Sequence, residues 1–350
     1  MKKLLPCFIF LMAIGLAPAF AQTAAKAKPM TVEELALYTG ADRQERLLEA
    51  AKKEGTLTLY HVYPALPNVA AAFTKKYGIA VKTWRAGSEA VLQRVIVEAK
   101  ANKFDVDIVQ NNPPENEAAY RERMLQEVRS SFHADLIPAA VPAHRQWVGI
   151  TSDIWTAAYN TSKISKQDLP KTYADLLNPK WKGMLGIEGN NHVWFGNLMH
   201  EMGEEQGLKL FNQLTATNGI SVRKGHSLLT MLVASNEVPL ALTVYSWNPE
   251  ALKLKGANIE GLVLQPLIAQ VSTIAMLKRA PHPHAALLFY DFMIGEGQKL
   301  LQAETFVPTS KKIPNAFSQM SVKYIDGATA LDQNARWIKL FEETVTKKSK

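Results

Sequence analysis

Short apolar strands alternate with amphipathic helices over the first folded stretch of this 350-residue chain. The pattern predicts strands at 56–60, 79–84 and 104–109, with helices at 67–77 and 88–99 between them. A strand–helix–strand order of this kind indicates a parallel sheet with right-handed crossovers, because parallel neighbours need a long connection. The fold class is therefore α/β, and ligands are expected beyond the carboxyl ends of the strands, near helix N-termini.

The second half of the chain repeats this order. Strands are predicted at 184–187 and 238–244, with a helix at 228–234 between them. Two longer extended stretches, at 148–160 and 264–278, join the halves. We therefore predict two lobes with a ligand-binding cleft between them. The predicted limits are 31–155 plus 270–350 for lobe 1 and 156–269 for lobe 2.

Residues 1–21 have the three parts of a secretory signal peptide. Lys2 and Lys3 are followed by an uncharged apolar run, and small residues precede a cleavage point after Ala21. An uncleaved membrane anchor is the alternative, but the polar residues that follow favour cleavage. We expect a periplasmic protein. Cleavage removes Cys7, the single cysteine, and two of the lysines behind the formal net charge of +8.

Composition and motifs argue against several function classes. With 47% hydrophobic and 21% charged residues the composition is globular, and one cysteine excludes a disulfide scaffold or a thiolate zinc site. No Gly-rich phosphate loop and no Gly-x-Ser-x-Gly elbow is found. His200-Glu201 begins like a zinc-protease helix, but Glu204 stands where a second histidine is needed. Lysines scattered among acids argue against nucleic-acid binding, so we predict no enzyme, no cofactor and no nucleic-acid partner.

Candidate ligand-binding residues follow the predicted strands in both halves. Backbone N–H groups at helix starts, together with hydroxyls, are suited to an anion. Each loop alone has an ordinary structural explanation, such as capping the next helix, but a shared place at strand ends favours a common site. The predicted residues are Tyr60, His61, Tyr63, Gly87, Ser88, Glu89, Asn111, Asn112, Asn190, His226, Ser227, Tyr245, Ser246 and Trp247.

Six segments, each weak alone, form a specific pattern together: 54–60, 84–89, 104–109, 158–161, 177–183 and 281–283. With them the chain resembles the periplasmic solute-binding proteins of ABC-type uptake systems, and more narrowly their ferric-iron-binding group, over nearly all of 31–320. The resemblance implies the two-lobed fold of type II binding proteins, with two crossover strands as the hinge. It also implies a monomer without catalytic activity that closes around a small ligand and delivers it to a membrane permease.

Ferric iron is one ligand that the resemblance implies. Iron-binding relatives typically use two adjacent tyrosines at the second-lobe strand end, whereas this chain has Tyr245 followed by Ser246. Tyr245 and His61 are the metal ligands that the resemblance would carry over. Where those relatives have a first-lobe carboxylate, the third strand ends in amides, and Glu89 and Glu115 are the nearest acids.

Relatives in the wider group bind phosphonates, sugar phosphates, carboxylates or polyamines, and a small organic anion is the other ligand class that we expect. Amides, hydroxyls and helix N-termini favour an organic anion over bare iron. Tyr63, Trp155 and Trp247 provide rings to pack against a carbon skeleton. An exported hydrolase or a sensor partner on the same scaffold is the alternative function.

Overall fold

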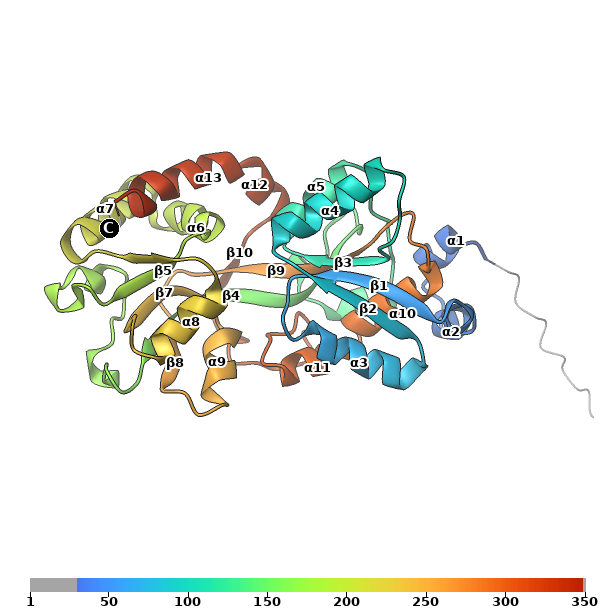
Figure 1. Ribbon diagram of the computed structural model, residues 1–350, viewed down its shortest axis with the longest axis horizontal. Coiled ribbons are helices and arrows are strands. Elements are labelled where there is room, and N and C mark those ends of the chain that lie inside the picture. The colour runs from blue at the N-terminus through green and yellow to red at the C-terminus, as the bar shows by residue number, and fades with distance from the viewer. Residues whose placement is uncertain (1–29, 349–350) are drawn as a thin grey trace, which may run out of the picture. The chain divides into compact units, whose positions relative to one another are not determined.

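A ten-stranded mixed sheet organises the chain (Figure 1). The computed structural model describes residues 30–348, so the predicted signal peptide lies outside the described residues. The strands are β1 (Thr56–His61), β2 (Ala80–Arg85), β3 (Ile108–Asn111), β4 (Val148–Asn160), β5 (Leu185–Glu188), β6 (Ser221–Arg223), β7 (Leu240–Tyr245), β8 (Ile259–Leu262), β9 (Leu267–Met276) and β10 (Val322–Tyr324). Their order is β2-β1-β3-β9-β4-β7-β5-β6, with β10 beside β9 and β8 beside β4.

Helices cover both faces of this sheet (Figure 1). Lysines in the last turn and a left-handed glycine end the two helices that flank β1, at Gly55 and Gly78, as the sequence pattern predicts. The helices are α1 (Val32–Leu37), α2 (Arg43–Glu54), α3 (Leu66–Tyr77), α4 (Ser88–Lys100), α5 (Pro113–Arg121), α6 (His192–Met202), α7 (Glu204–Asn218), α8 (His226–Ala234), α9 (Trp247–Lys253), α10 (Pro283–Ile294), α11 (Gly297–Ala303), α12 (Gly327–Asp332) and α13 (Asn334–Phe341).

Each half of the sheet contains one parallel group, as the strand–helix alternation predicts. β1 pairs in parallel with β2 and β3, and β5 pairs in parallel with β6 and β7. The third strand begins at Ile108 rather than 104. Just before it, the buried Asp107 side chain accepts the backbone N–H groups of Thr58, at 2.7 Å, and His282, at 2.6 Å. These two hydrogen bonds hold the chain in place just before β3, and the alternation pattern of a strand does not predict them.

Two long strands join the halves. β4 and β9 are antiparallel to each other and to their outer neighbours β7 and β3, and both are buried along their whole length. They are the two extended stretches that the sequence predicts. From Val32 onward the chain forms one compact unit, and β4 and β9 pair with strands of both halves of it.

The C-terminal helices divide between the halves. α10 packs on the first half, where Phe73 of α3 makes edge contacts with Phe289 and Phe292. α13 packs on α6, because Gly196 has no Cβ to collide with the Trp337 ring. The predicted lobe limits stay predictions, but this packing favours grouping the residues from 325 onward with the second half rather than with lobe 1.

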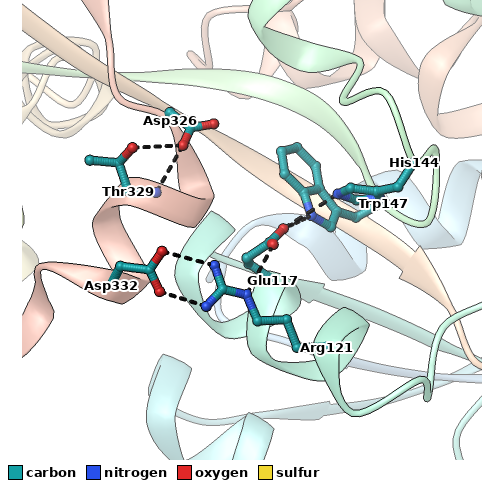
Figure 2. A network of polar contacts seen from close by, with 7 residues as sticks. All are labelled: Glu117, Arg121, His144, Trp147, Asp326, Thr329 and Asp332. Atoms are coloured by element: carbon teal, nitrogen blue, oxygen red, sulfur yellow. Dashed lines mark hydrogen bonds and ion pairs between the residues drawn. The ribbon is translucent and has the colours of Figure 1, made fainter.

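Helix α12 also contacts the first half (Figure 2). Asp326 caps α12 by accepting the Thr329 N–H at 2.8 Å. At the other end of α12, Asp332 accepts two bonds from Arg121 of α5, at 2.5 and 3.2 Å. Arg121 also lies 3.4 Å from the buried Glu117. The segment that completes the second half is therefore tied to α5 as well.

Candidate functional site

Aromatic side chains converge where β7 ends. The Tyr245 ring lies 4.1 Å from the His226 ring, 5.4 Å from that of Trp155 and 6.1 Å from that of Trp247, measured between centroids. These residues come from β7, the start of α8, β4 and the start of α9. With the contacts described next they form what we call the Tyr245 cluster: Tyr63, Asp153, Trp155, Glu188, Asn191, His226, Tyr245 and Trp247.

Asp153 links the cluster to the first half. It lies on β4, is fully buried, and accepts a 2.5 Å bond from the Tyr63 hydroxyl. The Tyr63 ring stacks on Phe306 at 4.5 Å and meets Trp247 edge-on at 6.0 Å. Burial raises the pKa of Asp153 to about 7, because no cation accompanies this carboxylate into the interior. Asp153 therefore takes up a proton near neutral pH far more readily than an exposed aspartate.

Glu188 joins two loops of the second half through hydrogen bonds. It ends β5 and is 2% exposed. One carboxylate oxygen accepts the Asn190 N–H at 2.7 Å and the other accepts the Gly225 N–H at 2.9 Å. Burial raises its pKa, and these backbone bonds oppose the rise. His226 Nε2 lies 4.0 Å away, but burial lowers the pKa of this histidine to about 3, so the imidazole is neutral.

Three carboxylates act on Tyr245. Burial is the main cause that holds the Tyr245 pKa well above 10, and the charges of Asp153, Glu188 and Glu115 add to it. Glu115 lies in the first turn of α5, and burial raises its own pKa to about 7. The Tyr245 hydroxyl accepts a bond from Gln270 at 3.2 Å. The site is thus acidic, with a neutral phenol at its centre.

Polar atoms without hydrogen-bond partners gather in this region. Buried polar groups are nearly always paired, so such a concentration marks a place where a ligand's polar groups fit. Asn191 shows the pattern: its Oδ1 accepts the Trp155 indole N–H at 3.0 Å, while its Nδ2 is unpaired. The unpaired atoms here are Glu115 Oε2, Asn191 Nδ2 and Ser246 Oγ, whereas the Trp247 side chain interacts with the Asp153 carboxylate and the Thr243 backbone with the His226 ring.

The predicted first-half residues bond mostly to one another. Asn112 donates to the Ser88 hydroxyl at 2.7 Å, and Asn111 donates to the Ser88 carbonyl at 3.0 Å. His61 is buried, and its Nδ1 lies 2.8 Å from the Tyr63 carbonyl oxygen. Tyr60 points elsewhere, because its hydroxyl donates to Glu98 at 2.9 Å. The structure therefore brings Tyr63, but not Tyr60, into the Tyr245 cluster.

Four of the remaining predicted residues, Gly87, Glu89, Asn190 and Ser227, are exposed. Helix α4 begins at Ser88 and helix α8 at His226, so Gly87 and Gly225 hold the cap positions in place of Ser88 and Ser227. Ser246 is buried in the loop between Tyr245 and Trp247.

Sequence reasoning missed Asp153 and Glu188. Asp153 stands inside an otherwise neutral extended stretch, where a charge without a function is costly, and this was an available signal. Glu188 is followed by Gly189 at a strand end, which is a weaker signal, because one of its two N–H partners, Gly225, lies nearly forty residues further along the chain.

The Tyr245 cluster coincides neither with a metal site nor with the surface hollow described next. Within residues 30–348, no three histidine, cysteine, aspartate or glutamate side chains are placed to hold a metal ion. A surface hollow of about 250 Å³ is lined by residues of α4, the loop before β3 and the segment after β9, and none of them belongs to the Tyr245 cluster. The cluster is thus defined by its contacts and its unpaired polar atoms.

Residues 118–326, more than half of the chain, match the family described as bacterial extracellular solute-binding protein. The chain belongs to this family. The family consists of solute-binding components of ABC uptake systems outside the cytoplasmic membrane, which implies a permease partner and a small ligand, and it is not enzymatic. Among residues 30–348 no helix has the length and apolarity to cross a bilayer.

Known relatives of this solute-binding protein are distant. An Fe(3+)-binding periplasmic protein of Serratia marcescens is 24% identical over 241 residues, covering 66% of this chain and 70% of that protein. Iron-bound HitA from Pseudomonas aeruginosa superposes with a TM-score of 0.69 at 24% identity, over 83% of this chain and 99% of that chain. AfuA from Actinobacillus pleuropneumoniae, with fructose-6-phosphate bound, gives 0.71 at 21%, over 84% and 99%. These similarities show the mixed α/β fold of two-lobed periplasmic binding proteins.

Proposed function

We propose that this solute-binding protein captures a small, positively charged organic ligand, such as an amine, at the Tyr245 cluster. The observation that carries the proposal is a set of three carboxylates whose charges all act on Tyr245: Asp153 and Glu188, which are buried, and Glu115, which is half-buried. Two basic residues lie at the margin, Lys224 near Glu188 and Arg85 near His61, and both are exposed. Water screens exposed charges far more than buried ones, so the carboxylates set the sign of the field.

The aromatic walls suit the same ligand class. A cation within about 6 Å of a ring face is attracted by the ring quadrupole, and Trp and Tyr are the favoured partners. Trp155 and Trp247 both lie against the Tyr245 ring, and Tyr63 contacts Trp247 from the first half. Carbon surface of this kind is suited to an organic cation rather than to a bare ion.

Delivery follows from the family. We propose that β4 and β9 are the hinge, that ligand contacts from both halves favour a closed state, and that the monomeric receptor presents this state to its permease. Asp153 supports this view because it lies on a joining strand and bonds to Tyr63 of the first half.

Ferric iron is the second candidate. Its support is the iron-binding function in the names of the Serratia and Pseudomonas relatives, together with the hard oxygen donors of Tyr245, Asp153 and Glu115. Iron binding predicts a tyrosinate-to-iron charge-transfer colour with ferric citrate, which Tyr245→Phe abolishes. The organic anion is less favoured, since the same carboxylates would repel it.

A melting-temperature screen tests the proposal. Purified protein is mixed with mono- and diamines, quaternary ammonium compounds, ferric citrate, sugar phosphates and carboxylates. A ligand at 100 times its dissociation constant adds about 2.7 kcal/mol of stability. We expect organic cations to raise Tm and anions to leave it unchanged. Stabilisation by anions alone would refute the proposal, and a coloured iron complex without any response to cations would establish the second candidate.

A further inference from the structure

Glu188 occupies the place where the second-half loops would otherwise hold an external anion. Its two carboxylate oxygens accept the N–H groups of Asn190 and Gly225, which precede α6 and α8. Backbone N–H groups at helix starts carry partial positive charge and are a common seat for phosphate and carboxylate ligands. Here a carboxylate of the chain itself fills that seat.

A buried polar group without a partner lies beside this seat. Asn191, next to one of the two N–H donors and 3% exposed, has an unpaired Nδ2. The charge of Glu188 also acts on Tyr245. The seat therefore borders the polar atoms of the cluster instead of capping an isolated helix.

We propose that Glu188 is an internal counter-anion, which keeps external anions out of this seat and turns its negative charge toward a cationic ligand. Two anions cannot share the same pair of N–H donors, because like charges in a buried site repel strongly. The exclusion of anions stands on the Glu188 geometry alone. The benefit to a cationic ligand rests on the proposed function.

The decisive variant is Glu188→Ala, which empties the seat and frees both N–H groups. Inorganic phosphate, from zero to about 10 mM at constant ionic strength, is the probe, and Tm is the readout. We expect no phosphate response in the unaltered protein and a saturable rise in Tm of about 2–4 °C in Glu188→Ala. Glu188→Asp keeps the charge, so it is expected to give no rise.

Asp153→Asn is the matched control. It removes a buried carboxylate of the same cluster that accepts from a side-chain hydroxyl rather than from backbone N–H groups, so it opens no anion seat. Glu188→Ser, whose hydroxyl can satisfy one N–H group, replaces the alanine variant if that protein is insoluble, and the same phosphate response is expected.

Two results would overturn the inference. In one, phosphate stabilises the unaltered protein as much as Glu188→Ala, which means that the seat is open. In the other, neither Glu188→Ala nor Glu188→Ser responds, which means that the two N–H groups form no seat. Failure of the proposed function would appear elsewhere, as an absence of stabilisation by organic cations, so the two failures are distinguishable.

Discussion

The two halves differ in whether the polar groups at their strand ends are hydrogen-bonded. In the first half Ser88, Asn111 and Asn112 bond to one another, and the buried Gln110 accepts the N–H groups of Val62 and Tyr63. In the second half and on β4, polar atoms stay unpaired beside rings and carboxylates. A satisfied network rigidifies a frame, whereas unpaired buried groups are costly unless a ligand completes them. The amide network of the first half thus acts as the frame, and the second half, together with Asp153 of β4 and Glu115 of α5, supplies the binding atoms.

The largest expected effect comes from Asp153→Asn on ligand affinity. Removing one partner of a buried, hydrogen-bonded charge pair costs about 2–5 kcal/mol of binding free energy. We therefore expect a cationic ligand from the screen to bind at least about thirtyfold more weakly by calorimetry. The fold is kept, because the asparagine oxygen still accepts the Tyr63 hydroxyl.

Asp168→Asn is the control for that experiment. Its carboxylate is exposed and lies 3.8 Å from Lys180 in another part of the second half. Its affinity is expected to match that of the unaltered protein. Equal affinities in Asp153→Asn and Asp168→Asn would contradict the division between frame and binding atoms.

Gln110→Ala tests the frame through stability. Gln110 Oε1 accepts two backbone N–H groups and its Nε2 donates to Ser272 at 2.6 Å, so the variant leaves buried groups unpaired. We expect the free energy of unfolding to fall by about 1–3 kcal/mol in urea denaturation. Gln44→Ala, an exposed glutamine with one bond to Tyr77, should change it by less than about 0.5 kcal/mol. A Gln110 variant that loses affinity without losing stability would reverse its assignment.

Binding is also expected to depend on pH. Burial raises the pKa values of Asp153 and Glu115 to about 7, and a cation binds their ionised forms. Affinity should therefore fall about tenfold from pH 8 to pH 6 for each group that must ionise. An affinity that rises on acidification would indicate an anionic ligand.

The same shifts have the opposite sign for the ligand-free protein. The folded carboxyls hold their protons up to about pH 7, whereas the unfolded chain loses them near pH 4. The two groups therefore lower the stability as pH rises from about 4 to about 7, and their contribution is constant above that range. Urea titrations across this range measure the slope.

Sequence periodicity was sufficient for the framework. It predicted both parallel groups, both joining strands, and the placement of His226, Tyr245 and Trp247 at strand ends, because strand length and helix spacing are local properties. Which residue fills a hydrogen-bonding seat depends on loops that meet only in the folded chain. The sequence therefore indicated an anion seat at the loop of His226 and Ser227 but did not reveal that Glu188 occupies it.

The packing partner of the C-terminal helix α13 could not be predicted from the sequence either. Helix α13 is amphipathic in any arrangement, and its choice of α6 depends on Gly196 leaving room for Trp337. A single missing Cβ in one helix and a large ring more than a hundred residues later cannot be matched by periodicity alone.

The packing of α13 has a consequence for the order in which the chain folds. Trp337, Phe341 and Val345 complete the core that surrounds Phe195 and Phe211. During synthesis this core therefore stays open until residues 337–345 have been made, which is after all the strands that the structure describes.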